Sequence, residues 1–313
     1  MKGALTINKT RISFFIFFFY INITISIKRE HFKEYIYFLS KITIKINTSG
    51  NQQQIFSSSF NKNYYPSSIV INNIEQPSTK IGANAFDLTE KSNIIELTWN
   101  TALTNCQKMF YNCDKIEEVD LSQFIGKGVT KYNNMFEDCA SLTSVNLSNL
   151  DTSSALDMSY MFLNCSKITS LDLSSFNTYK VTNMNFMFSG CKSLKYINVS
   201  SFDSSRVQYM VHMFHNCTSL ESLDLSNFNT PSLLNFSFMF AESENLTYIN
   251  LNKFNTSKVV EMKRVFFSCK SLISLNLSSF DTSKTTGMIS MFYGCENLIS
   301  LDLSSLIQQY LEI

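Results

Sequence analysis

The sequence predicts an α/β solenoid of 26-residue repeats, each a short parallel strand and a short helix, with a small β-rich cap before the first repeat. Three observations support this. Met-Phe recurs every 26 residues from Met109 to Met291, with Val265 replacing Met once. A Cys follows each pair at a fixed distance in all units but one, and a strand-like Leu-x-Leu-Ser pattern follows the Cys. Repetition at one fixed period is typical of solenoids, in which stacked units share a core.

The repeat unit reads M-F-x-x-C-x-x-L-x-x-L-x-L-S-x-F-(D/N)-T-x-x-V-x-x-M. A single unit cannot bury its apolar side alone, so we expect consecutive units to stack and to bury columns of Leu, Phe, Met and Cys. The cysteine column consists of Cys113, Cys139, Cys165, Cys191, Cys217, Cys269 and Cys295, with Ser243 in the remaining unit.

The two halves of the unit differ in periodicity. The Leu-x-Leu-Ser part alternates with period two, which indicates a short strand with one buried face. Val181, Met184, Met187 and Phe188 lie at i, i+3, i+6 and i+7, which indicates one face of a helix. Asn177-Thr178 precedes them and is suited to a turn and a helix N-cap. We therefore expect a parallel sheet on one side of the solenoid and helices on the other.

The repeats predict the domain boundaries. Residues 28–93 contain the strand-like runs KITIKIN (41–47) and SIVIN (68–72), and we interpret them as a β-rich cap or module. Residues 94–306 form the predicted solenoid, in which IIELTWN (94–100) is a degenerate first strand. Residues 307–313 remain as a C-terminal tail and a thin cap.

Residues 1–27 have the composition of an export signal. Lys2, Lys9 and Arg11 precede the apolar run ISFFIFFFYI (12–21), and only 16 residues separate Arg11 from Lys28. A membrane-spanning helix needs roughly 20 apolar residues, whereas a signal-peptide core needs about 7–15. A signal peptide is the first interpretation. The alternatives are an uncleaved hydrophobic anchor that attaches the chain to a membrane through residues 12–27, and a buried strand or a mispredicted start, because no Ala-x-Ala cleavage site follows.

The units resemble the BspA-like leucine-rich-repeat surface protein family of bacteria and protists. The resemblance is carried by MFSGCKSLKYINVSSFDSSRVQYM (187–210) and its copies over about residues 100–306, including CKSLISLNLSSFDTSKTTGM (269–288). It implies a right-handed leucine-rich-repeat solenoid exported to the cell surface, with adhesion or host interaction as its role. It provides no catalytic residues to transfer. The cap and the absence of a recognisable C-terminal anchor depart from the family.

The polar side of the strands is the candidate ligand face. One residue per unit lies between two buried aliphatics and should face outward, and Tyr196 and Tyr248 share a second outward slot. No two aspartates are neighbours in the row, which avoids repulsion of about 1 kcal/mol in water between carboxylates ~5 Å apart. The row is either a self-satisfying ladder of Asx side chains or a face that binds a glycan, a protein or, less simply, calcium. Its members are Asp120, Asn146, Asp172, Asn198, Asp224, Asn250, Asn276 and Asp302.

The cysteines and histidines could suggest metal or disulfide chemistry. Cysteines of adjacent units would lie about 5 Å apart, within the Cα range for a disulfide, but the five consecutive cysteines from 113 to 217 cannot all pair. Buried free thiols explain the spacing more simply. His212 and His215 stand near Cys217, a conceivable zinc constellation. Other units carry unrelated residues in both histidine slots, so we predict outward positions and no metal site.

The remaining composition narrows the function. A formal net charge of +1 without a basic block argues against nucleic-acid binding. We find no phosphate-binding glycine loop, metal motif or nucleophile with a base, so we predict neither an enzyme nor a cofactor. The leading hypothesis is a secreted or surface-displayed protein that binds a protein or glycan through the strand face. The alternative is an intracellular scaffold on the same solenoid. The sequence leaves the oligomeric state open.

Overall fold

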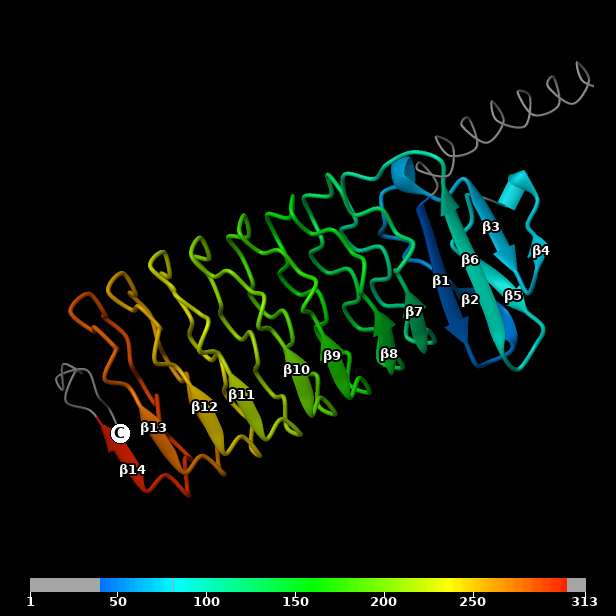
Figure 1. Cartoon of the computed structure of the whole chain (residues 1–313). Coiled ribbons are helices and arrows are strands. Elements are labelled where there is room, and N and C mark those ends of the chain that lie inside the picture. Colours follow the sequence, from blue (N-terminus) through cyan, green and yellow to red (C-terminus); the bar gives the residue numbers. More distant parts are fainter. Residues whose placement is uncertain (1–39, 81, 303–313) are drawn as a thin grey trace, which may run out of the picture. The chain divides into compact units, whose positions relative to one another are not determined.

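The computed structural model describes residues 40–80 and 82–302 (Figure 1). The chain divides into two compact units, Met1–Leu39 and Ser40–Ile313, and the first lies wholly outside the described residues. The predicted export signal (1–27), the first part of the predicted cap (28–39), the end of the last repeat and the tail (307–313) therefore lie outside them too. No helix within the described ranges is long and apolar enough to cross a membrane.

The second unit begins with an antiparallel β cap. Its strands are β1 (Ser40–Ile46), β2 (Gly50–Gln54), β3 (Ser68–Ile71), β4 (Ile74–Glu75), β5 (Ala85–Leu88) and β6 (Asn93–Trp99), with 3-10 turns η1 (Lys62–Tyr64) and η2 (Ser78–Lys80). The main sheet has the order β4-β3-β6-β1-β7-β8, and β2 pairs with β5 separately. The strand-like runs that predicted a β-rich cap therefore form β1 and β3.

Period-two patterning explains the cap sheet. Ile42, Ile44 and Ile46 of β1 are fully buried, whereas the polar residues between them are half-buried. In β6 the indole N–H of Trp99 donates a 2.7 Å hydrogen bond to the carbonyl oxygen of Tyr64, which satisfies the only polar atom of a buried ring.

The segment 94–100, expected as the first strand of the solenoid, lies instead inside the cap sheet. β6 runs antiparallel to both β1 and β3, whereas a repeat strand would run parallel to its neighbours. Its seven residues can pair along the whole length of β1, which a three-residue repeat strand cannot do. The repeat period alone therefore placed the boundary too early.

The solenoid adds one three-residue strand per 26-residue coil. These strands are β7 (Glu118–Asp120), β8 (Ser144–Asn146), β9 (Ser170–Asp172), β10 (Tyr196–Asn198), β11 (Ser222–Asp224), β12 (Tyr248–Asn250), β13 (Ser274–Asn276) and β14 (Ser300–Asp302). They pair in parallel as β7–β8, β9–β10, β11–β12 and β13–β14. β1 pairs antiparallel with β7, so the cap covers the edge that the first coil would otherwise expose.

The predicted short helices are wrong, because the other half of each coil is a chain of tight turns. Within a coil the amide of Cys191 donates to the carbonyl of Phe188, three residues earlier, while the amide of Phe188 donates to Met213 in the next coil. Amides thus alternate between a turn and the neighbouring coil, and the i to i−4 bonds of an α-helix do not form.

Two residues of every coil also have a left-handed backbone, which a helix excludes. One immediately precedes the Met-Phe pair, with φ between 54° and 59°, and the other immediately precedes the Cys or Ser243. The slot before Cys holds mainly Asn, Asp and Gly, which tolerate this conformation.

The longest ladder of the solenoid lies on this turn side. Single parallel bridges connect Asn105, Lys131, Asp157, Asn183, Tyr209, Asn235, Glu261 and Gly287 without a break. The strand side, in contrast, is divided into two-stranded pieces beyond β8. Hydrogen bonding between coils is therefore most regular where the sequence predicted helices. The right-handed sense of the solenoid remains a prediction.

The core consists of the predicted columns. The Leu, Met, Phe and Cys positions are almost all below 6% exposed through Met291. Val145 and Ile197, in the central aliphatic slot of their strands, are partly buried, and burial weakens again in the last coil. The Phe of each Met-Phe pair stacks on the next from Phe110 to Phe292, with ring centroids 5.2–6.0 Å apart. Coils of identical length keep identical side chains in register, so one buried column extends through the whole array.

Candidate ligand-binding face

The strand side presents the predicted outward row. The alternation of each strand turns its central aliphatic inward and its first and third residues outward. Tyr196 and Tyr248, in the first position of β10 and β12, are 59% and 53% exposed. Asn146, Asp172, Asp224 and Asn276 are exposed, and Asp120, Asn198 and Asn250 are partly buried, while the side chain of Asp302 lies outside the described residues. The predicted ligand-face residues therefore lie in one continuous row along the solenoid.

Each described Asx side chain of this row also closes a turn. The Oδ1 atom accepts the backbone N–H two residues later, at 2.8–3.2 Å, from Asp120 through Asn276. This Asx turn bends the chain after the strand and uses one acceptor of each side chain. Between coils, Asn198 Nδ2 donates to Asp172 Oδ1 at 3.1 Å. The row thus has a structural role, and its outer oxygens and amides still face solvent.

A second Asx row lies at the next corner of the coil and is followed by a buried hydroxyl. Thr178 is fully buried, donates to the carbonyl of Asp203 and accepts the amide of the same residue at 2.9 and 2.8 Å. Thr152, Thr230 and Thr256 make the same pair of bonds to their next coils. The Asn-Thr or Asp-Thr motif, predicted as a helix N-cap, is therefore a clamp between consecutive coils.

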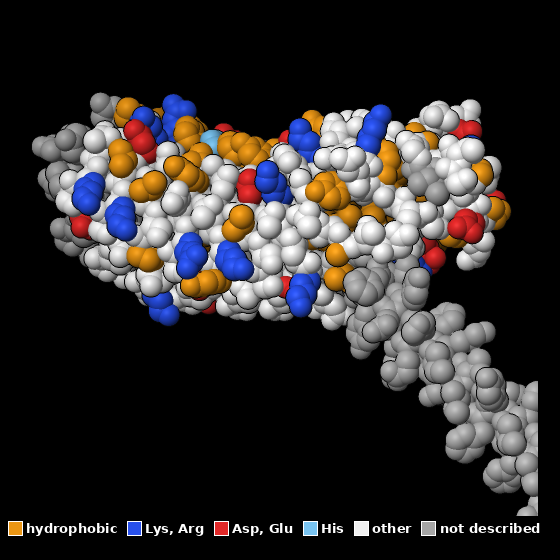
Figure 2. All heavy atoms as spheres, turned by 90° about the horizontal axis from the view of Figure 1, so that it is seen from above, with side chains coloured by type: hydrophobic (Ala, Val, Ile, Leu, Met, Phe, Trp, Pro, Cys, Tyr) orange, Lys and Arg blue, Asp and Glu red, His pale blue; other side chains and the backbone are white. Residues whose placement is uncertain are grey.

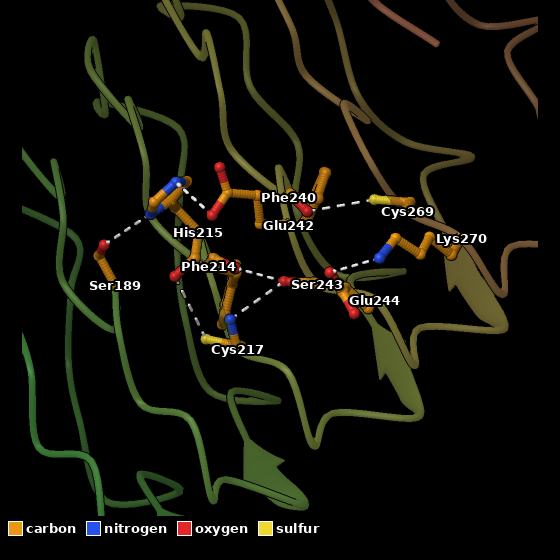
Figure 3. Close-up of polar contacts among 10 residues, drawn as sticks. All are labelled: Ser189, Phe214, His215, Cys217, Phe240, Glu242, Ser243, Glu244, Cys269 and Lys270. Carbon is orange, nitrogen blue, oxygen red and sulfur yellow. Dashed lines mark hydrogen bonds and ion pairs between the residues drawn. The ribbon is translucent and has the colours of Figure 1, made fainter. Parts of the chain in front are cut away.

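The cysteine column forms a similar ladder (Figure 3). Each Sγ from Cys139 onward donates to the carbonyl of the Phe 29 residues earlier at 3.0–3.2 Å. Ser243 makes the same bond to Phe214 at 2.7 Å. All eight cysteines are free thiols, and only Cys295 is less than fully buried. Burial raises the pKa of Cys217 to about 12 and that of Cys295 to about 11, so the thiolate form that reacts or binds metal is suppressed.

The histidine slots are not the unconstrained outward positions that the sequence predicted. His212 is half-buried and stacks between Phe186 and Phe238, with centroids 4.5 Å away on each side. Tyr160 extends this column at one end, 4.8 Å from Phe186, and the Arg264 guanidinium lies 5.7 Å from the Phe238 ring at the other. In Figure 2 histidine lies within a band of hydrophobic side chains along one edge.

This column was missed because its slot varies in residue type between coils. Its members all have a left-handed backbone, which is unfavourable for aromatic residues. Stacking on the same residue class in the next coil compensates for that cost, with about 0.5–1.5 kcal/mol per aromatic pair. Four consecutive aromatic rings in one slot, from Tyr160 to Phe238, were the available signal.

His215 lies beside this column and has polar partners on both sides (Figure 3). Its Nδ1 is 3.3 Å from the hydroxyl of Ser189, and its Nε2 is 3.8 Å from a carboxylate oxygen of Glu242. Burial lowers the pKa of His215, and burial with the neighbouring His215 lowers the pKa of His212 to about 4. Both imidazoles are therefore neutral at pH 7. Within residues 40–80 and 82–302, no group of three or more His, Cys, Asp or Glu side chains could hold a metal ion.

The family follows from comparison with known proteins. A family model described as "Mycoplasma protein of unknown function, DUF285" matches three overlapping stretches, residues 83–195, 166–249 and 224–307. The chain belongs to the DUF285 family. The DUF285 matches extend over the solenoid and begin in the cap, at the residues just before β5. This supports a repeat family, whereas the narrower BspA-like assignment remains a prediction.

Two further comparisons add little to the DUF285 assignment. One solved structure that matches is a leucine rich cell surface protein from Faecalibacterium prausnitzii A2-165, 17% identical, with 63% of this chain and 75% of that chain covered and a TM-score of 0.22. Similarity at this level supports no inference about activity. No curated protein matches the chain significantly.

Proposed function

We propose that this DUF285 chain is an exported, surface-displayed binding protein that contacts a protein or glycan ligand through its strand face. The observation that carries the proposal is the continuous outward row from Asp120 to Asn276, with two tyrosines more than half exposed. Side chains repeated at one spacing along a rigid array suit an extended ligand, because each coil adds one more contact point. The apolar segment 12–21 supports export.

The proposal does not include catalysis. The buried thiols have raised pKa values, and the histidines are used in stacking and in contacts with Ser189 and Glu242. The outward positions of the strands carry Asx, Ser, Glu and Tyr side chains at regular spacing, and among those that the structure describes no hydrogen bond joins a nucleophile to a base. A binding role through whatever side chains the exposed row presents is the simpler function of such a surface.

Localisation is the decisive experiment. Intact cells that express the full chain with a C-terminal tag should be labelled by a membrane-impermeant biotin reagent, and the tagged protein should be captured with the labelled surface fraction. A known cytosolic protein in the same cells is the control for lysis. Recovery of the chain solely from the cytosol would reject the proposal in favour of an intracellular scaffold, and sequencing of the mature N-terminus would then read from Met1 or Lys2.

A further inference from the structure

Two exposed tyrosines distinguish one part of the strand face from the rest. The first position of the repeat strands is Glu or Ser in every coil except β10 and β12, where it is Tyr196 and Tyr248. Neither ring stacks on another ring among the described residues, although most aromatic side chains of the solenoid do. The coil between them carries Ser222 in this position, directly in register with Tyr248. Two large side chains therefore flank a small one.

The spacing leaves room for one flat group between the rings. Adjacent strands are about 4.8 Å apart, so side chains two coils apart are separated by roughly 10 Å. A group in contact with both rings needs about 3.5–4.0 Å on each side. Such a sandwich spans about 7–8 Å, so a planar group has room between Tyr196 and Tyr248, above Ser222, and contacts both rings once they lean toward it, while a direct contact between the two rings does not form.

The charge of this slot is negative. The coil between the tyrosines carries Glu221 and Asp224, both exposed, whereas the coils on either side carry the neutral Asn198 and Asn250 in the Asp224 position. We compared strands β10, β11 and β12 together with the one residue before each of them. The only cation in this set is Lys195, which immediately precedes Tyr196. None of these charged residues forms an ion pair within the described part of the chain. The charged groups near the two aromatic rings are thus two carboxylates and one ammonium group, which leaves a net negative charge.

We propose that the slot between Tyr196 and Tyr248 binds the guanidinium group of an arginine side chain on a protein partner. A guanidinium is planar, stacks on aromatic faces and pairs with carboxylates in a fork geometry. Glu221 and Asp224 supply the carboxylates. Ile273 and Ile299, on the same side of the next two coils, are 49% and 87% exposed and extend an apolar surface beside the slot. A peptide segment that carries aliphatic residues next to its arginine would cover both, which a free small cation would not do.

This inference specifies the ligand of the proposed binding face and is tested on the purified full chain. The probe is the peptide acetyl-Gly-Leu-Arg-Leu-Gly-amide, titrated while tyrosine ring resonances are observed by NMR. Its control replaces arginine by citrulline, which has nearly the same shape and no charge. We expect saturable binding of the arginine peptide, at least tenfold weaker binding of the citrulline peptide, and weaker binding of a lysine peptide than of the arginine peptide.

The repeats provide variants that preserve the fold. Ser occupies the tyrosine slot in five of the eight coils, Thr occupies the Glu221 slot in three and Asn the Asp224 slot in four, so Y196S/Y248S and E221T/D224N only exchange one natural coil surface for another. Each double variant is expected to weaken binding at least fivefold. Tyr179→Ser, at an exposed tyrosine on another corner whose slot elsewhere holds Ser, should leave the affinity unchanged. Lys195→Thr should strengthen binding, because it removes the neighbouring positive charge.

Equal affinity of the parent chain and Y196S/Y248S, or equal affinity for the arginine and citrulline peptides, would overturn the inference. Tyrosine-dependent binding of a neutral oligosaccharide such as chitotriose without binding of the arginine peptide would overturn it too, in favour of a glycan ligand. A chain that is surface-labelled but fails these titrations refutes the arginine slot alone. A chain that passes them but is recovered only from the cytosol refutes the proposed localisation alone.

Discussion

The hydroxyl of Ser243 donates a 2.7 Å hydrogen bond to the carbonyl oxygen of Phe214, in the place where every other coil from Cys139 onward uses a cysteine thiol. The same hydroxyl accepts the backbone amide of Cys217 at 3.3 Å. Serine therefore reproduces the one directional contact of the column in a fully buried position. The column is selected for a small donor, and neither disulfide formation nor metal binding is needed to explain it.

Cys191→Ser should accordingly cost less stability than Cys191→Ala. The serine keeps a donor to the carbonyl of Phe162, to which the Cys191 thiol donates at 3.2 Å, whereas alanine removes the donor and leaves a small cavity, at a cost of about 1–3 kcal/mol. Urea unfolding of the two variants measures the difference in the free energy of unfolding. A larger loss for serine than for alanine would show that the column is chosen for apolar volume.

Thiol accessibility should follow burial along the solenoid. Cys295 is half-buried, while the other cysteines are fully buried with pKa values raised by desolvation. At pH 8 a disulfide reagent such as DTNB should react first with one thiol, and C295S should abolish that phase. The remaining thiols should react only when urea unfolds the chain. Rapid reaction of several thiols in the native state would contradict the packing of this column.

Thr178→Val should destabilise the solenoid more than Thr178→Ser. Valine preserves the shape but leaves both the amide and the carbonyl of Asp203 without the Thr178 hydroxyl, at about 1–3 kcal/mol for each unsatisfied group. Serine keeps the hydroxyl, as Ser204 does in the following coil, where it donates to Asn229. Thermal unfolding should therefore rank the variants parent, serine, valine. If valine were as stable as serine, the clamp would contribute no net free energy.

The sequence predicted the buried columns and the outward strand row, because strict repetition determines which side chains meet between coils. It gave the wrong secondary structure for the turn half. A chain of β-turns directs one side chain inward every three residues, as at Val181, Met184 and Met187, and this spacing resembles the 3.6-residue period of a helix. The left-handed residues that decide between them include Phe186 and His212, whose residue types give no warning of that backbone.

The stacked column that contains His212 could not be predicted from the sequence for a related reason. When the residues in one slot are compared between coils, a slot that varies in residue type is interpreted as structurally unconstrained. Phe186, His212 and Phe238 differ in type, but each has a planar ring, and these rings stack. The Asx turns show the opposite case. There the residue type at Asn177 predicted a turn correctly, because its Oδ1 accepts the amide of Tyr179 two residues later. The strand row makes the same local bond at Asp172 and Asn198, which was not predicted for it.

The two histidines should make the solenoid less stable in acid. The native state holds both imidazoles neutral, because burial lowers the pKa of His212 to about 4 and also lowers that of His215. The unfolded chain binds protons near pH 6.5, so it takes up more protons than the native state below that value. The contribution of the two neutral histidines to the free energy of unfolding is therefore fully present above about pH 7 and is lost as the pH decreases toward 4.

His212→Phe tests this prediction. Phenylalanine stacks with Phe186 and Phe238 as the neighbouring coils do, so the variant should match the parent at pH 7.5. At pH 4.5 it should retain about 1–2 kcal/mol more of its free energy of unfolding than the parent, once solvent screening of the partly exposed ring is allowed for. Glu242 faces His215 at 3.8 Å and opposes the effect there, so His215→Phe should show a smaller gain. Parallel pH profiles of parent and His212→Phe, from urea unfolding between pH 4.5 and 7.5, would show that the stacked ring does not control acid stability.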